Sequence, residues 1–431
     1  MKIIAISALP LWVMGGQKGL PTIYYAEKGF VDAGHEVHFI TPDLPLWRTK
    51  LDEEWQKKPK EENYEGIQVH RFSIPFLPHL RRLYLGKLPS QKTLRCVKRA
   101  VAFCSLSLLV VLFTARALQT AFHVAAVCKP NVVYAHNGIA AAAAYILAKR
   151  RRIPNVTRLY GTFLSQIRWS TPHLLLHFPE VLGFKIPCTY LIVTNDGTQG
   201  DQVAARLGVP QSRVKFWVNG VDRGMYDPTL TIEEAKRRIG VPPEKRLVLT
   251  LNRLDRWKRI DRLIEAVPDL IALYPNVLVL IVGDGIERDN LVRLSSTLGV
   301  GNYVKFTGAV PHTNVTDYMH AADVFVSTQD ATNFGNHLLE AMVCGRCIVT
   351  LNNGDTGNFI TNNDNGILLE PDDLRSLPTA IAKLLHDDVL RKQLGDGALR
   401  YARQNFQTWD ERMRTEVKLI EDLVGRAPGL A

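Results

Sequence analysis

Residues 2–41 read KIIAISALPLWVMGGQKGLPTIYYAEKGFVDAGHEVHFIT, and this stretch decides the fold of the chain. Its first six residues form a short apolar run that ends before a proline and the pair Gly15-Gly16. Apolar residues at helical spacing follow and stop at Gly34, and the run EVHFIT comes next. The stretch therefore predicts a strand, a loop, a helix and a second strand.

The same alternation recurs along the chain with one interruption, a segment at 222–245 that is rich in proline and charge. Strand-like runs lie at 130–136, 188–195, 214–219, 246–254, 277–285, 303–308, 323–328 and 347–353. Strands that alternate with helices form parallel sheets covered on both faces, and 431 residues exceed what one core supports. We expect an α/β protein with two Rossmann-like domains that face a cleft, at 1–221 and 222–407. The amphipathic segment 408–431 is expected to cross back to the first domain.

The composition narrows the class of partner. A net charge of +11 favours anionic partners, of which sugar nucleotides, acidic lipids and nucleic acid are the three to weigh. The sequence has no recognition helix, zinc knuckle or basic stretch with interleaved aromatics, which argues against nucleic acid. Its six cysteines form no disulfide framework, and the opening residues lack a signal-peptide cleavage site, so we expect a cytoplasmic protein. Cys344 and Cys347 are interpreted as small buried residues rather than metal ligands.

Three loops carry residues suited to anion binding, and open parallel sheets bind ligands where such loops follow the strands. The glycines of 15–18 permit close backbone approach to a ligand, although a tight turn explains them equally well. Arg253 and Lys258 lie five residues apart between a strand and a helix, where two cations can hold a diphosphate. Gly335-Asn336 precede another helix, with Glu340 about one turn inside it.

Taken together, these stretches resemble the retaining glycosyltransferases of family 4, group 1, which have the GT-B fold. The resemblance covers nearly the whole chain and rests on the order and spacing of several motifs. These are GHEVHFITP (34–42), KPNVVYAHNG (129–138), VNGVDRGMYDP (218–228), NRLDRWK (252–258), IVGDG (281–285), VKFTGAVPHTNVTDYMHAADVFVST (304–328), FGNHLLEAMVCG (334–345) and NGDTGNFI (353–360).

The resemblance implies a role for each matching residue. Arg253 and Lys258 match the pair that binds the donor diphosphate, and Glu340 matches a glutamate that bonds the ribose hydroxyls. His136 matches a histidine that lies against the donor sugar at the reaction centre, and Gly16 matches a loop that closes over phosphate and acceptor. A histidine that is merely hydrogen-bonded at a strand end remains the alternative for His136. Further donor-binding positions are Thr332, Asn333, Phe334, Gly335 and Asn336.

The reaction that the resemblance implies needs no separate base, metal or cofactor. The acceptor hydroxyl attacks on the face that the nucleotide leaves, and a diphosphate oxygen takes its proton. The protein then positions the reactants and stabilises charge, which suits a site of cations and helix ends. The donor is expected to be a UDP- or GDP-linked hexose.

Thr332 departs from the family pattern, which has a glutamate eight residues before Glu340. A threonine hydroxyl can make one hydrogen bond to a sugar but brings no charge, and the loss is expected to cost roughly 1.5–3 kcal/mol. Asn333 or Asp330 could take over the contact. A non-catalytic sugar-nucleotide binder and a GT-B sugar-nucleotide epimerase stay open as alternatives. A nicotinamide-dependent enzyme does not fit, because the first glycine loop lacks G-x-G-x-x-G.

A basic strip lies beside an apolar segment in the first half of the chain. Residues 81–99 hold seven Lys or Arg and no acidic residue, and residues 100–115 carry no charge. Sixteen residues fall short of the roughly 20 that cross a bilayer, so we expect no spanning helix there. Either residues 100–128 form a core helix of the first domain, or the apolar segment is a helix on an anionic leaflet, or the helix is core and the basic strip alone touches lipid. With either form of lipid contact the enzyme would be peripheral at the inner face of the cell membrane, with a lipid-linked acceptor and a role in polysaccharide or glycolipid synthesis.

Overall fold

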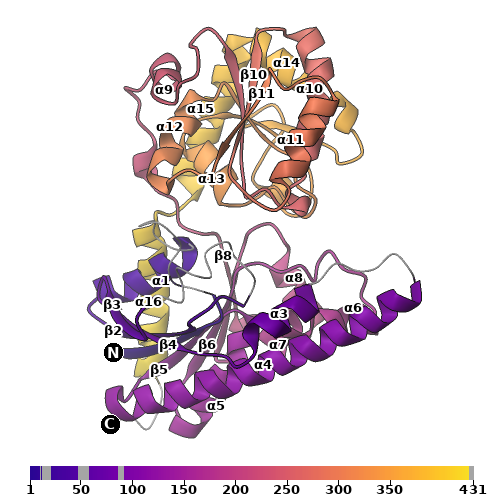
Figure 1. Cartoon of the computed structure of the whole chain (residues 1–431). Coiled ribbons are helices and arrows are strands. Elements are labelled where there is room, and N and C mark those ends of the chain that lie inside the picture. The colour runs from indigo at the N-terminus through magenta and orange to yellow at the C-terminus, as the bar shows by residue number, and fades with distance from the viewer. Residues whose placement is uncertain (10, 12–20, 47–57, 86–91, 427–431) are drawn as a thin grey trace. The chain divides into compact units, whose positions relative to one another are not determined.

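The computed structural model describes residues 1–9, 11, 21–46, 58–85 and 92–426, which form two compact units. The first unit consists of 1–195, 200–217 and 410–431, and the second consists of 196–199 and 218–409. Each unit is a twisted sheet with helices on both faces (Figure 1). The predicted α/β fold with two parallel-sheet domains is therefore confirmed.

The first unit contains an eight-stranded sheet in the order β3-β4-β2-β1-β5-β6-β7-β8. All neighbouring pairs are parallel except β3 with β4 at the edge. The order reverses between β1 and β5, so the ends of these two strands flank the switch point. The strands are β1 (Lys2–Ser7), β2 (Glu36–Pro42), β3 (Glu61–Tyr64), β4 (Ile67–Phe72), β5 (Val132–His136), β6 (Asn155–Leu159), β7 (Tyr190–Thr194) and β8 (Val214–Trp217).

Helices cover the two faces of this sheet with separate apolar cores. One core joins the sheet to α3, α4 and α5, and the other joins it to α1 and the C-terminal helix α16. The helices are α1 (Pro21–Asp32), α3 (Leu77–Leu85), α4 (Lys92–Cys128), α5 (Gly138–Arg151), α6 (Thr171–Leu176), α7 (Phe178–Lys185), α8 (Gly200–Arg206) and α16 (Trp409–Gly425). The segment predicted to return to the first domain thus contains α16, which packs in the first unit.

The second unit contains a six-stranded, all-parallel sheet in the order β11-β10-β9-β12-β13-β14. Its order reverses between β9 and β12, and parallel strands open a ligand crevice at such a reversal. The strands are β9 (Arg246–Leu251), β10 (Val277–Val282), β11 (Val304–Gly308), β12 (Val324–Ser327), β13 (Cys347–Leu351) and β14 (Ile367–Leu369). Every strand expected from the sequence forms, and β3, β4, β6 and β14 are additional.

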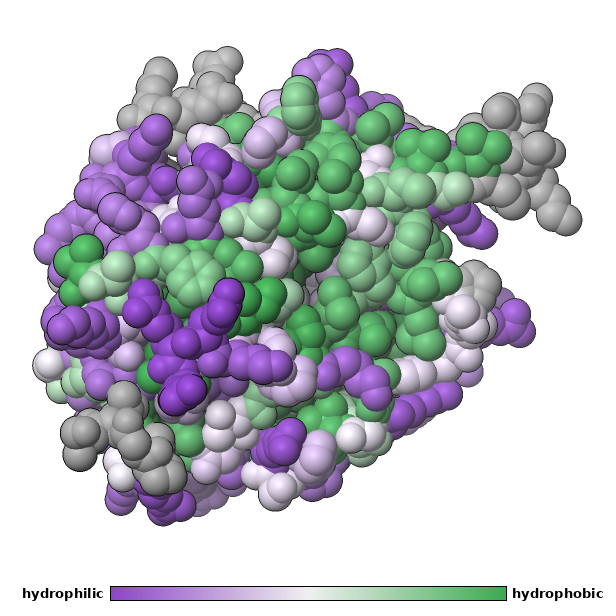
Figure 2. Space-filling view, turned by 90° about the horizontal axis from the view of Figure 1, so that it is seen from below, coloured by the Kyte–Doolittle hydropathy of each residue, from purple (hydrophilic) through white to green (hydrophobic). Residues whose placement is uncertain are grey.

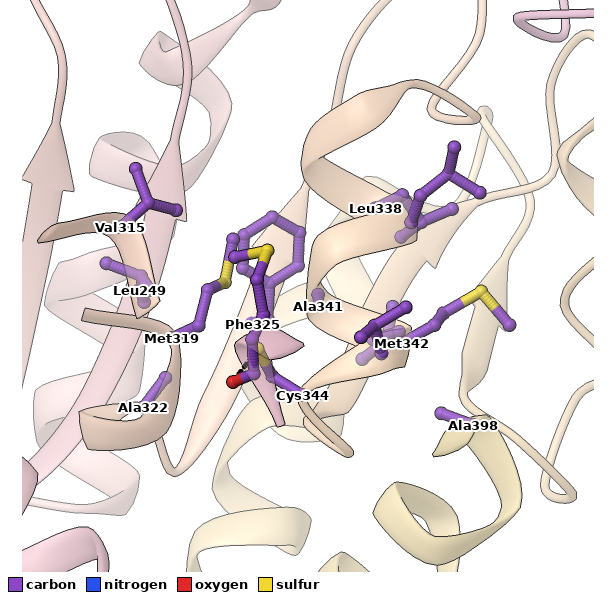
Figure 3. Packing of buried hydrophobic residues seen from close by; sticks show 14 of the residues in the cluster. Leu249, Val315, Met319, Ala322, Phe325, Leu338, Ala341, Met342, Cys344 and Ala398 are labelled. Atoms are coloured by element: carbon purple, nitrogen blue, oxygen red, sulfur yellow. Dashed lines mark hydrogen bonds between the residues drawn. The ribbon is translucent and has the colours of Figure 1, made fainter. Parts of the chain in front are cut away.

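Two helical layers enclose the second sheet, one with α10, α11 and α14 and the other with α9, α12, α13 and α15. Figure 3 shows Phe325 of β12 and Cys344 among apolar side chains from α12, α13 and α15. Burial raises the pKa of both Cys344 and Cys347 to about 12, which suits inert packing residues. The helices are α9 (Ile232–Arg238), α10 (Ile260–Leu273), α11 (Arg288–Thr297), α12 (Val315–Ala321), α13 (Asn336–Val343), α14 (Leu377–His386) and α15 (Asp388–Asn405).

Helix α4 is longer than the uncharged stretch at residues 100–115. It continues through Arg116, whose guanidinium reaches out to the carbonyl of Ser73 at 3.0 Å, and ends at Cys128. Its part from Val97 to Cys128 is long and apolar enough to cross a membrane by length and composition, and an 18-residue window within it has a mean hydropathy of 2.1. The length argument against a spanning helix therefore fails. One face of α4, with Leu109 and Phe113, nevertheless lies in the core of the first unit, as a core helix requires.

A buried ion network ties α16 to the first sheet. The Glu416 carboxylate lies 3.1 Å from Arg158 Nη1 and 2.9 Å from Arg412 Nη2, and it accepts a hydrogen bond from the Tyr134 hydroxyl. Burial opposes ionisation of Glu416, but the Arg158 and Arg412 cations lower its pKa. Glu416 and Arg158 are fully buried, so loss of one partner would leave an uncompensated charge in the core.

We expect Glu416→Gln to lower the free energy of unfolding of the first unit by about 3–5 kcal/mol, because two buried guanidinium groups lose their anion. Urea unfolding followed by circular dichroism measures the change. Glu421→Gln is the matched control on the same helix, since Glu421 is half exposed and pairs only with His35 among described residues, and its loss should cost less than about 1 kcal/mol. Equal effects of the two substitutions would contradict the prediction.

Candidate active site

The crevice of the second unit is built from the loops that follow β9 and β12, and polar contacts hold these loops together. Lys258 Nζ donates to Gln329 Oε1 at 2.7 Å, and the Asp330 amide donates to the Trp257 carbonyl at 3.2 Å. The two strands are neighbours in the sheet, so their loops leave it at the same edge. The predicted cation pair and the predicted helix start therefore belong to one site.

Lys258 is the buried cation of this site. Burial, together with the charge of the neighbouring Arg253, lowers the pKa of Lys258 to about 7. Its ammonium group lies 3.8 Å from the centroid of the Trp257 ring. Arg253 is exposed, and its guanidinium pairs with Asp255. An incoming diphosphate would restore the full charge of Lys258, because an anion favours the protonated amine.

A buried amide network sets the shape of the loop after β12. Asn333 Oδ1 accepts hydrogen bonds from the Ser327 hydroxyl at 2.7 Å and from the backbone N–H of Gln329 at 2.8 Å. Asn333 Nδ2 donates a hydrogen bond to Asn353 Oδ1 at 2.8 Å. Gln329 Nε2 lies 2.6 Å from Nε2 of His337, whose pKa burial holds far below its usual value. The Asn333 side chain is thus fully buried and hydrogen-bonded within the loop, so it cannot take over a hydrogen bond to the donor sugar.

Helix α13 begins beside the cation pair. Gly335 is its N-cap in an extended conformation, and the first N–H groups of a helix have no carbonyl partner within it. The Asn336 side chain accepts a hydrogen bond from Asn219 at 2.9 Å. Phe334 is fully buried and stacks on Phe359 with ring centroids 3.5 Å apart, so its side chain supports the helix start from the core.

Glu340 lies one turn inside α13 and is partly exposed. His312, which follows β11, places Nε2 at 3.2 Å from Glu340 Oε1. The hydrogen bond with Glu340 raises the pKa of His312 above its usual value. A carboxylate held in this way at the rim of a helix start can accept hydrogen bonds from two neighbouring hydroxyls.

Thr332 is enclosed by glycine backbone. A Cβ atom on Gly197 would lie 2.0 Å from Thr332 Oγ1, and one on Gly354 would lie 2.9 Å from Thr332 Cβ. The threonine hydroxyl accepts a hydrogen bond from the Phe334 amide at 3.0 Å. Thr332 therefore shapes the loop, and its only described hydrogen bond is local.

His136 stands at the carboxyl end of β5, at the switch point of the first unit. Its ring is fully buried, with Glu27 Oε1 2.5 Å from Nε2 and the Tyr160 hydroxyl bonded to Nδ1. Burial raises the pKa of Tyr160 well above its usual value, so Tyr160 keeps its proton and donates it, while His136 donates to Glu27. The predicted Gly16 lies outside the described residues.

Two supporting residues were not foreseen. Gln329 positions Lys258, and His312 holds Glu340. Gln329 and His312 both follow parallel strands, at the edge of the sheet where ligands bind. Polar residues directly after such strands are the sequence signal that identifies them. Among the described residues, no group of three or more His, Cys, Asp or Glu is arranged to hold a metal ion.

Comparison with known families matches almost the whole chain. Residues 22–224 match the family described as Glycosyltransferase Family 4, and residues 231–400 match Glycosyl transferases group 1. The chain belongs to the family 4, group 1 glycosyltransferases. An uncharacterized glycosyltransferase of Methanocaldococcus jannaschii is 25% identical over 407 residues, which cover 93% of each chain.

Solved structures agree on the GT-B fold. Sucrose-phosphate synthase from Thermosynechococcus elongatus superposes with a TM-score of 0.74 at 20% identity, covering 99% of this chain and all of the other. HepE of Anabaena, solved in complex with UDP-glucose, gives a TM-score of 0.68 at 20% identity over 97% of this chain and all of the other.

We expect Thr332→Glu, which restores the family residue, to destabilise the second unit by about 1–3 kcal/mol, because the longer side chain overfills the space against Gly197 and Gly354. Thr332→Ser keeps the hydroxyl and serves as the matched control. Urea unfolding of the three proteins measures the difference. If the glutamate variant were as stable as the wild type, the position would have room for a larger side chain and the enclosure described above would not hold.

Proposed function

We propose that this chain transfers a hexose, with retention of configuration, from a nucleotide diphosphate sugar to an acceptor hydroxyl. One observation carries the proposal: a desolvated lysine and the start of α13 share the switch point of the second sheet. The Lys258 ammonium donates a hydrogen bond to the Gln329 side chain, which is neutral and so does not offset the lysine charge. A diphosphate is the anion that two cations and a helix start fit best.

The proposed roles follow from the placement of each group. Arg253 and Lys258 take up the negative charge that builds on the diphosphate as the sugar departs, and the N–H groups at Gly335 and Asn336 add to this stabilisation. Glu340 accepts hydrogen bonds from the ribose hydroxyls. The reaction needs no metal or cofactor, because cations of the protein supply the charge. A structural relative was solved with UDP-glucose, which supports a UDP-linked hexose as the first donor to test.

His136 has a positioning role in this proposal. Both of its ring nitrogens are occupied by Glu27 and Tyr160, which leaves neither free to exchange a proton with an acceptor. The buried ring instead fixes the end of β5 at the carboxyl edge of the first sheet. This arrangement agrees with a reaction in which a diphosphate oxygen takes the proton of the acceptor.

The test is nucleotide release from a panel of UDP-, GDP- and ADP-sugars, with and without a lipid extract as acceptor source. We expect one donor to be hydrolysed slowly and Glu340→Gln to weaken its use by about 10- to 100-fold, since a charged hydrogen bond to ribose is lost. The control is Glu370→Gln, an exposed carboxylate that bonds Asn352. Donor binding without release from any donor, even with the extract, would instead favour the non-catalytic binder, and exchange of one sugar epimer for another would favour the epimerase.

We further propose that the enzyme works in the cytoplasm at the inner face of the cell membrane on a lipid-linked acceptor. Between Gly66 and Pro179 the sequence holds sixteen Lys or Arg and no Asp or Glu. Figure 2 shows a broad apolar surface on the side of the first unit that carries α4. Its exposed apolar residues follow one helical stripe, namely Val97, Val101, Leu108 and Val111. An apolar stripe among cations suits an anionic leaflet, each cation near the surface adding about 1 kcal/mol.

We expect the wild type to float with vesicles of phosphatidylcholine and phosphatidylserine, and much less with phosphatidylcholine alone. The double variant Leu108→Asp/Val111→Asp should reduce the bound fraction about tenfold or more, because two side chains that are 49% and 62% exposed become charged. Val389→Asp in the second unit, at a 79% exposed position, is the control. If the bound fraction were the same with and without phosphatidylserine, and the same for the wild type and the double variant, membrane contact through α4 would be refuted.

A further inference from the structure

A groove with apolar walls lies between α4 and α6 in the first unit. Its cavity volume is about 230 Å³. The residues that line it are Arg99, Ala100, Phe103, His173, Leu175 and Leu176. Phe103 also packs edge to face on Phe178 of α7, with ring centroids 5.6 Å apart, so the groove has a fixed wall. The groove is hydrophobic except for one cation and one histidine.

The topology places this groove on the side of the first sheet toward which the carboxyl ends of its strands point. Helix α4 precedes β5 and runs antiparallel to it, as crossover helices do, so α4 begins at the carboxyl edge of the strands. Helix α6 follows β6 and therefore starts from the same edge. At 37 residues, α4 is about 55 Å long, far more than a five-residue strand, so its first turns extend past the sheet. His136 ends its strand at this edge.

The polar groups at the groove favour an anionic head. Within the described part of the chain, Arg99 has no acidic partner, and the surrounding 114 residues from Gly66 to Pro179 contain none in their sequence. The Ser170 hydroxyl lies 2.8 Å from His173 Nδ1 and orients that ring. A cation and a histidine beside apolar walls match a phosphate that is joined to a hydrocarbon chain.

We propose that the groove between α4 and α6 binds the hydrocarbon chain of a phosphate-linked lipid acceptor, with the phosphate at Arg99 and His173. The inference rests on the proposed function, since it names the acceptor class of that reaction. Ala100 of the groove is next to Val101 of the exposed apolar stripe, so the groove and the stripe share the same part of α4. The sequence from Gly66 to Pro179, which supplies every residue that lines the groove, has no acidic residue, and this favours a lipid phosphate over a neutral lipid.

The experiment measures binding of dodecyl phosphate, below its micelle concentration and without vesicles, to the full chain by calorimetry. Ala100→Trp fills the groove at an exposed position, and Val127→Trp adds the same bulk at a 79% exposed site on the same helix. We expect Ala100→Trp to weaken binding about tenfold or more and Val127→Trp to change it less than about twofold. Arg99→Gln should weaken dodecyl phosphate but not neutral dodecyl maltoside, and inorganic phosphate should not compete.

Equal affinity of the wild type and Ala100→Trp would overturn the inference, as would competition by inorganic phosphate. Self-association that buries the groove, detected by sedimentation and abolished by Ala100→Trp without any effect on dodecyl phosphate, would also overturn it in favour of a second copy. Nucleotide release without acceptor is recorded on the same samples and should not change. If all samples lacked release but retained groove binding, the proposed function would fail while the lipid site stood.

Discussion

The contact between Lys258 and Gln329 is the interaction on which the site depends. It joins the loops after β9 and β12 at the point where the strand order reverses, so it sets the width of the crevice. Its partner is an amide, and an amide can orient an ammonium group without neutralising it. A carboxylate in place of Gln329 would hold the lysine more tightly but would cancel the charge that a diphosphate needs. Burial and the charge of Arg253 lower the pKa of Lys258 to about 7, and a bound diphosphate would favour the protonated form again.

The first unit contains buried ion pairs that hold its sheet, its C-terminal helix and His136 together. Glu416 is ionised between the Arg158 and Arg412 cations. Glu27 bonds to Nε2 of His136. Charged groups in a core tolerate little movement, because the loss of a partner would leave a buried charge uncompensated. These contacts hold the ends of β5 and β6 in place, which suits the positioning role proposed for His136. The C-terminal helix contributes to this arrangement through Glu416, although it lies far from these strands in sequence.

Local pattern accounts for most of what could be predicted. Apolar runs and their spacing are sufficient for the strands, and Arg253 and Lys258 lie within one short loop, so their proximity follows from the sequence. Contacts across long separations could not be read in this way. The enclosure of Thr332 depends on Gly197, which is distant in sequence, and the position of Gln329 matters only because β12 pairs with β9. The uncharged run 100–115 does not reveal the full length of α4, because Arg116 lies inside the helix and its long side chain reaches a backbone carbonyl.

Under the proposed membrane contact, helix α4 would meet two apolar environments, which would account for apolar residues on two of its faces. Leu109, Phe113 and Ala117 lie on the face that packs in the core, while Val97, Val101, Leu108 and Val111 lie on the opposite face and are exposed. A helix that served only the core would gain nothing from apolar residues on its outer stripe. A helix that crossed a bilayer would have to leave the sheet and expose the core beneath it. The proposed position at the surface of an anionic leaflet would satisfy both faces, and cations near the stripe would add electrostatic attraction.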